Sequence, residues 1–184
     1  MKKIIVLLLI ASLLTGCSEK AKDSSVTNTT ENTQEKSYEE SLKNNIKKIM
    51  APDFELKNLD GTTTRLSDLR GKNVIINFWA TWCGFCVEEM PDLQKLQNTY
   101  KDKDLVVLAI NVGESKEVVE KFMKDNNLDL EVVLDEDSEV SNIYGVRSFP
   151  TTLVVSKDGE ALGSHSGMLT YEQMEQLYDF FEEE

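Results

Sequence analysis

Residues 74–91 have the sequence VIINFWATWCGFCVEEMP, and this stretch decides the fold. Its apolar first part, which ends at Trp79, has the composition of a strand covered on both faces. Its second part begins a helix that we expect to run from about Cys83 to Tyr100. Buried strands that alternate with helices form a sheet with helices packed on its faces. The stretch therefore predicts an α/β fold.

The residues on either side continue this alternation. A hairpin is expected over 54–66, with its turn at Asp60 and Gly61. Apolar runs predict strands at 105–112, 130–134 and 151–155 and a last strand from 161, and helical periodicity predicts helices at 115–126, 139–144 and 170–181. We therefore predict a three-layer α/β/α domain over residues 51–184, with a β-hairpin at its N-terminal end.

Two of these helices carry specific predictions of capping and burial. In the helix at 115–126, Ser115 is the expected cap, and the expected inward residues are Val118, Val119, Phe122 and Met123. In the helix at 170–181, Thr170 is the expected cap, and the expected inward residues are Met174, Leu177, Tyr178 and Phe181.

Composition excludes several classes of protein. Of the 184 residues 40% are apolar, which is enough for a packed core, and the net charge is −13. A chain this acidic is a poor candidate for binding nucleic acid, because contacts with phosphate need Lys or Arg. Three cysteines and one histidine argue against a Cys/His zinc site and allow only one internal disulfide. The histidine, His165, is expected at the surface. We predict neither a metal site nor a bound cofactor.

The N-terminus has the pattern of an export signal. Lys2 and Lys3 precede an apolar run over 4–14, which is too short to span a membrane. The sequence Leu-Thr-Gly-Cys at 14–17 resembles the bacterial lipoprotein box. That resemblance implies cleavage after residue 16 and a lipid on the sulfur of Cys17. An ordinary signal peptide with an incidental cysteine is the alternative.

A polar segment separates Cys17 from the folded region. Residues 18–37 contain only two apolar side chains, Ala21 and Val26, so they are expected to form a disordered tether. Residues 38–49 have apolar residues at helical spacing, which fits either a short amphipathic helix or more tether. The predicted organisation is a signal peptide at 1–16, a lipidated tether at 17–50 and the domain at 51–184.

Cys83 and Cys86 are the strongest candidates for chemistry. Residues three apart in the first turn of a helix are close enough for a disulfide. The free N–H groups and the positive dipole end of that turn favour a thiolate at Cys83. Cys86, one turn further, is expected to be more buried. A redox-active pair is the preferred interpretation; half of a zinc site and a purely structural disulfide are the alternatives.

Several segments together resemble a known family. The stretch at 74–91, with the segments at 51–54, 69–72 and 149–152, looks like the thioredoxin superfamily. The likeness is close to its membrane-tethered extracytoplasmic branch, the TlpA/ResA-like thiol–disulfide oxidoreductases. Residues 112–134 resemble the strand-and-helix insertion of that branch. The resemblance implies a thioredoxin-like fold over about 51–184.

The resemblance also implies roles for the residues around the pair. Cys83 matches the nucleophile, Cys86 the resolving thiol and Trp82 the aromatic residue beside them. Gly84 and Phe85 lie between the cysteines and are expected to line the active site. Phe85 stands where many relatives have proline, and this difference leaves the direction of electron flow open.

Three more positions take roles from the resemblance. Pro150 matches a cis-proline that faces the dithiol, and the backbone of Phe149 before it would offer an edge for strand-like pairing with substrate. Glu89, three residues past Cys86, matches an acidic position near the active site. It is expected to be partly buried, to raise thiol pKa values and to shuttle a proton to or from Cys86. A solvated surface glutamate is the alternative.

These features predict an enzyme anchored on the outer face of the cell membrane. Its expected activity is the reduction of disulfides in exported proteins, and the resemblance implies electrons supplied by a membrane thiol carrier. The same dithiol would serve an oxidant that installs disulfides. A peroxiredoxin-like peroxidase is disfavoured, because Ala80 and Ile76 occupy positions where that motif has Thr or Ser and Pro. A non-catalytic binding module is disfavoured by the intact cysteine pair.

Overall fold

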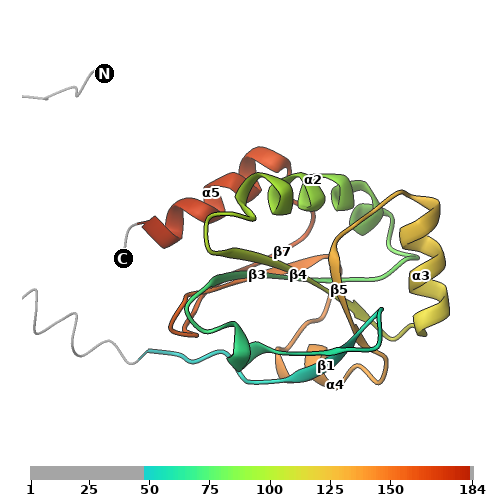
Figure 1. Ribbon diagram of the computed structural model, residues 1–184, viewed down its shortest axis with the longest axis horizontal. Coiled ribbons are helices and arrows are strands. Elements are labelled where there is room, and N and C mark those ends of the chain that lie inside the picture. The colour runs from blue at the N-terminus through green and yellow to red at the C-terminus, as the bar shows by residue number, and fades with distance from the viewer. Residues whose placement is uncertain (1–47, 183–184) are drawn as a thin grey trace, which may run out of the picture. The chain divides into compact units, whose positions relative to one another are not determined.

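A seven-stranded mixed sheet forms the centre of the structure (Figure 1). The structure is a computed structural model that describes residues 48–182. The predicted signal peptide, Cys17 and tether lie outside these residues. So does the segment considered for a helix at 38–49, apart from Lys48 and Ile49, which are not helical. None of the helices in the described range has the length and apolar character needed to cross a membrane.

The order of the strands is β2-β1-β5-β4-β3-β6-β7. The three inner strands β3, β4 and β5 run parallel, and antiparallel hairpins complete both edges. Parallel neighbours need a crossover, and helices supply it here. The strands are β1 (Glu55–Asn58), β2 (Thr63–Arg65), β3 (Asn73–Trp79), β4 (Leu105–Val112), β5 (Glu131–Asp135), β6 (Thr151–Val155) and β7 (Ala161–Ser166). The predicted hairpin at the N-terminal end is confirmed, and it joins the sheet beside β5.

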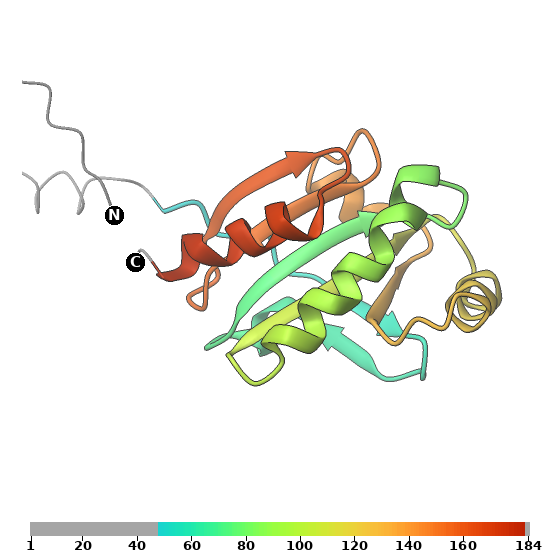
Figure 2. The same cartoon turned by 90° about the horizontal axis from the view of Figure 1, so that it is seen from above.

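Helices cover both faces of the sheet. The helices are α2 (Gly84–Tyr100), α3 (Lys116–Asp125), α4 (Glu139–Ile143) and α5 (Tyr171–Glu182), with a 3₁₀ turn η1 (Leu66–Leu69). Figure 2 shows α2 and α5 side by side over one face, and Figure 1 shows α4 on the opposite side of the sheet. The three-layer α/β/α fold predicted from the sequence is confirmed.

Two cores follow from the alternation of side chains along β3. Ile75 packs into the core beneath α2, α3 and α5, whereas Ile76 and Phe78 pack into the core on the side of η1 and α4. Successive side chains of a strand point to opposite faces, so a strand between two helical layers must be apolar at almost every position. Asn77 is the exception in β3, and it is fully buried.

The predicted burial of α5 is confirmed, whereas that of α3 is wrong in one residue. Met174 is fully buried, and the amide of Gln173 donates to the Thr170 hydroxyl at 3.4 Å. In α3, Val118 is 47% exposed, because the helix touches the core along the narrow stripe that contains Val119 and Met123. Ser115 occupies the capping position of α3 but makes no side-chain capping hydrogen bond.

Candidate active site

The two cysteines lie at the start of α2 and form a disulfide. Cys83 is the N-cap residue, and its sulfur accepts a hydrogen bond from the amide of Cys86 at 3.2 Å. Cys83 is 8% exposed, whereas Cys86 has no exposed surface. An incoming sulfur can therefore reach Cys83 and not Cys86. The amide that points at the Cys83 sulfur would also stabilise a thiolate there.

Exposed aromatic rings flank the disulfide. Trp82 is 70% exposed and Phe85 is 64% exposed, which is unusual for large apolar side chains. The ring of Trp82 meets that of Phe149 edge to face, with 5.8 Å between their centroids. Gly84, between the cysteines, has open space around it. These residues make an apolar rim around Cys83.

The cis peptide expected at Pro150 is present. The Phe149–Pro150 bond is cis, and Pro150 is buried at the point where β6 begins. Phe149 makes no backbone hydrogen bond to another residue in the described range. Its N–H and C=O groups are therefore available for pairing with an extended segment of another chain.

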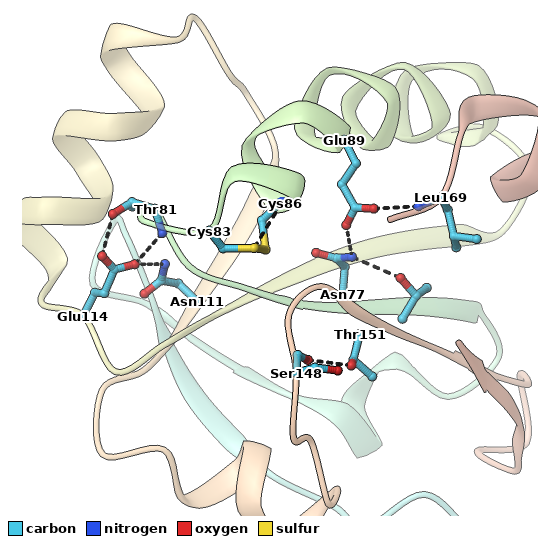
Figure 3. The surroundings of a disulfide bond; sticks show 11 residues. Asn77, Thr81, Cys83, Cys86, Glu89, Asn111, Glu114, Ser148, Thr151 and Leu169 are labelled. Carbon is cyan, nitrogen blue, oxygen red and sulfur yellow. Dashed lines mark hydrogen bonds between the residues drawn. A yellow bond between two sulfur atoms is a disulfide. The ribbon is translucent and has the colours of Figure 1, made fainter. Parts of the chain in front are cut away.

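Glu89 is more buried than the sequence predicted. Only 1% of its surface is exposed, and its two carboxylate oxygens accept hydrogen bonds from the Asn77 side chain at 2.7 Å and the Leu169 amide at 3.0 Å (Figure 3). Burial raises the pKa of Glu89 from 4.5 to about 7, although the hydrogen bonds from Leu169 and Asn77 act in the opposite direction. Near neutral pH this carboxyl is poised to gain or lose a proton.

Asn77 is a site residue that the sequence analysis missed. Its side-chain amide group donates to Glu89 and, at 3.1 Å, to the hydroxyl of Thr152. Its side-chain oxygen is buried and has no hydrogen-bond partner among the described residues. A single polar residue within an apolar strand was the available signal, because such a residue needs buried partners.

Glu114 is a second residue that the sequence analysis missed. One carboxylate oxygen accepts hydrogen bonds from the amide of Thr81 at 2.7 Å and the side chain of Asn111 at 2.8 Å. The other oxygen accepts from the Thr81 hydroxyl at 2.5 Å. Figure 3 shows Glu114 and Asn111 beside the turn that leads into Cys83. No local pattern pointed to Glu114, since it lies 33 residues from Thr81 in the chain.

A groove of about 730 Å³ runs past Cys83. Its lining comes from the start of α2, the end of β4, helix α4 and the loop before Pro150. The lining residues are Trp82, Cys83, Gly84, Val112, Gly113, Ser138, Ser141, Asn142, Val146, Arg147, Ser148 and Phe149. The groove thus brings together the accessible cysteine, the aromatic pair and the unpaired backbone of Phe149.

The structure does not bring every candidate residue to this site. His165 lies in β7, where it is exposed and lines a separate cavity of about 240 Å³. Within residues 48–182, no three His, Cys, Asp or Glu side chains are grouped so that they could hold a metal ion.

Comparison with known proteins finds relatives that are named as thiol-disulfide oxidoreductases. Residues 48–161 match the AhpC/TSA family, and residues 1–18 match the prokaryotic membrane lipoprotein lipid attachment site. The thiol-disulfide oxidoreductase ResA of Geobacillus kaustophilus is 45% identical over 125 residues, which are 68% of this chain and 72% of that protein. ResA of Bacillus subtilis is 39% identical over 120 residues, which are 65% and 67% of the two chains.

Solved structures show the same fold. A putative thiol:disulfide interchange protein DsbE from Chlorobium tepidum superposes with a TM-score of 0.68 at 32% identity, covering 73% of this chain and 96% of that one. The exposed lipoprotein thioredoxin Etrx1 of Streptococcus pneumoniae superposes with a TM-score of 0.62 at 34% identity, covering 70% and 99%.

Proposed function

This chain belongs to the AhpC/TSA family and is a thioredoxin-like thiol–disulfide oxidoreductase, and from that premise we propose that Cys83 and Cys86 are its redox-active pair. The observation that carries the proposal is the asymmetry of the disulfide. One sulfur is accessible at a helix N-terminus, and the other is buried behind it.

In the reducing direction, the thiolate of Cys83 attacks one sulfur of a substrate disulfide. A mixed disulfide forms and the first substrate thiolate leaves. The thiolate of Cys86 then attacks the Cys83 sulfur, which releases the second substrate thiolate and leaves the Cys83–Cys86 disulfide. Two electrons pass from the enzyme to the substrate, and the two thiol protons end on the substrate sulfurs. Every step runs in reverse when the protein acts as an oxidant.

Glu89 is the proposed proton acceptor and donor for Cys86. Cys86 is fully buried and must lose a proton before it attacks. Glu89 lies one helical turn further along α2, and a pKa of about 7 lets it exchange protons near neutral pH. Asn77 and the Leu169 amide hold its carboxylate in place.

The proposed substrates are exported proteins that dock as extended segments. The unpaired backbone of Phe149 beside Cys83 offers the edge for such pairing, Trp82 and Gly84 line the groove there, and Phe85 is an exposed aromatic residue between the cysteines. The lipid attachment site supports anchoring in a membrane through Cys17. We place the domain at 51–184 on the extracytoplasmic face, joined to the lipid by residues 17–50. There a membrane thiol carrier would return it to the reduced state.

Reduction of insulin disulfides by the full-length protein in non-ionic detergent tests the assignment. Wild type is expected to be active, whereas Cys83→Ser removes the attacking thiol and the activity. Cys86→Ser is expected to accumulate a mixed disulfide that is visible on non-reducing gels. Cys17→Ser is the matched control, because it removes a cysteine outside the pair and leaves the rate unchanged. Equal rates for wild type and Cys83→Ser would overturn the proposal.

The direction of electron flow is measured separately. Equilibration of the pair with a glutathione series gives its reduction potential. A value near that of thioredoxin, about −270 mV, assigns a reductant, and a value near about −120 mV assigns an oxidant. We propose the reductant, since the exposed lipoprotein Etrx1 of Streptococcus pneumoniae, which is similar to this chain, is named a thioredoxin.

A further inference from the structure

The groove beside Cys83 differs in charge from the rest of the protein. The chain has a net charge of −13. Among the groove's lining residues, however, there is no Asp or Glu, and Arg147 carries the one permanent charge. The remaining polar lining is neutral and consists of Ser138, Ser141, Asn142 and Ser148.

Arg147 is not engaged by the protein itself. Its side chain is exposed and makes no ion pair or hydrogen bond to another residue in the described range. The other two arginines of the chain have intramolecular contacts. Arg65 pairs with Glu55, and the guanidinium group of Arg70 lies against Gly159. An unpaired arginine in the same groove as Cys83 is available for a group on the substrate.

Two carboxylates beside groove residues, those of Asp135 and Glu114, are already engaged by other donors. Asp135 accepts hydrogen bonds from the amides of Val140 and Ser141 at the start of α4. Glu114 accepts its hydrogen bonds from Thr81 and Asn111. Both are held by N–H or O–H donors. The charged residues Asp137 and Glu139 flank Ser138 in sequence but do not line the groove.

Arg147 is also placed where a docked segment must pass. It lies two residues before Phe149, whose ring contacts Trp82 and whose backbone is unpaired. A segment that pairs with Phe149 and presents its sulfur to Cys83 would therefore run close to the guanidinium group. Arginine binds carboxylates through two parallel hydrogen bonds, which gives the contact direction as well as charge.

Building on the proposed function, we propose that Arg147 determines substrate preference. The favoured substrates are protein segments with Asp or Glu next to the cysteine that Cys83 attacks. The overall field of an acidic protein acts in the opposite direction, because it repels acidic segments and attracts basic ones. A preference for acidic substrates would therefore come from the local charge in the groove and not from the net charge.

Three cyclic peptides test this proposal. Each has one internal disulfide, and they differ only in the residues that flank both cysteines, which are Asp, Asn or Lys. The rate constant for reduction by the reduced full-length protein is divided by that for reduction by dithiothreitol, which corrects for differences in peptide reactivity. At low ionic strength, wild type is expected to prefer the Asp peptide over the Lys peptide by about threefold to tenfold. Added salt is expected to reduce the preference.

Variants separate the local effect from the net charge. Arg147→Gln is expected to abolish the preference for Asp, and Arg147→Glu to reverse it. Lys157→Glu is the matched control, because it changes the net charge as much as Arg147→Glu but lies in the turn after the far end of β6. It is expected to keep the wild-type preference.

The outcomes distinguish this proposal from the proposed function. Equal or Lys-favouring rates in wild type, or the same change in Lys157→Glu as in Arg147→Glu, would overturn the role of Arg147 while leaving dithiol exchange intact. If wild type reduces none of the three peptides and no insulin, the proposed function itself fails.

Discussion

At the scale of single residues, Glu89 is a carboxyl group whose pKa the fold raises to near neutral pH. It is enclosed between α2, β3 and the segment before α5, where burial favours its neutral form. Its pKa is about 7 in the folded protein and 4.5 in its ordinary environment. Between these values the folded state binds more protons than the unfolded state. The free energy of unfolding therefore falls as the pH rises through this interval and is constant above it.

Replacing Glu89 by Gln is expected to remove this dependence. Gln has no charge to bury, although it offers one acceptor oxygen to the two donors Asn77 and Leu169. Between pH 5 and pH 8 the stability of the variant should therefore fall less than that of wild type, by on the order of 3 kcal/mol. Urea unfolding of the oxidised proteins at pH 5, 6, 7 and 8 gives the comparison. If the free energy of unfolding changed with pH in the same way in both proteins, the assignment of the titration to Glu89 would be contradicted.

At the scale of elements, Glu114 ties the turn between β3 and α2 to the loop after β4. Both the amide and the hydroxyl of Thr81 donate to its carboxylate, and Asn111 holds the carboxylate from β4. The turn leads directly into Trp82 and Cys83. A residue in one loop thus holds the backbone that leads into Cys83.

Loss of this connection is expected both to slow the reaction and to destabilise the fold. Glu114→Ala should lower kcat/KM for insulin reduction by about tenfold, because the turn before Cys83 becomes more mobile and the sulfur is less often in a reactive position. Stability should fall by about 1–3 kcal/mol, since the Thr81 amide loses its acceptor. Thr81→Val removes only the hydroxyl.

A double-mutant cycle with these two substitutions checks that the effect passes through Thr81. The hydroxyl and the carboxylate are in direct contact, so their effects on kcat/KM should be less than additive. Full additivity would show that Glu114 acts by another route. Glu114→Gln, which retains the acceptor oxygens in part, is expected to recover some of the lost rate.

At the scale of the whole molecule, the sheet separates two cores and carries the active site at one end. The C-terminal end of β3 leads into the turn before Cys83. Pro150 lies directly before the start of β6, the strand that pairs with β3. The antiparallel pairing of Phe78 with Thr151 brings these two chain segments together. The acidic composition of the chain and its lipid attachment site have separate consequences.

Membrane residence is expected to depend on Cys17 alone. The whole chain has a net charge of −13, and an acidic protein is not attracted to anionic lipid, so acyl chains must supply the affinity. Cys17→Ser should move the protein from the membrane fraction to the soluble fraction of fractionated cells without changing the insulin-reducing rate. Retention of the variant in the membrane fraction at high salt would show that another segment provides the anchor.

Local features of the sequence were enough to predict the layers of the fold and the redox pair. Apolar runs, helical periodicity and a three-residue spacing all act between neighbours in the chain, so they can be recognised without knowing the tertiary structure. The order of β-α units and the position of Cys83 and Cys86 were predicted for this reason. The exposure of Val118 in α3 was not predicted, because the width of a helix's buried stripe depends on how the helix packs against the sheet.

The surroundings of the cysteine pair were decided by the tertiary structure. Glu89 meets the Leu169 amide across 80 residues of sequence, and Thr81 meets Glu114 across 33. Arg147 enters the groove of Cys83 because β6 pairs with β3. The sequence by itself determined which two sulfurs lie within bonding range and that a helix begins beside them. Only the tertiary structure determined which groups hold Glu89 and Glu114 and which cation lines the groove, since such contacts depend on segments that are neighbours in space and not in the chain.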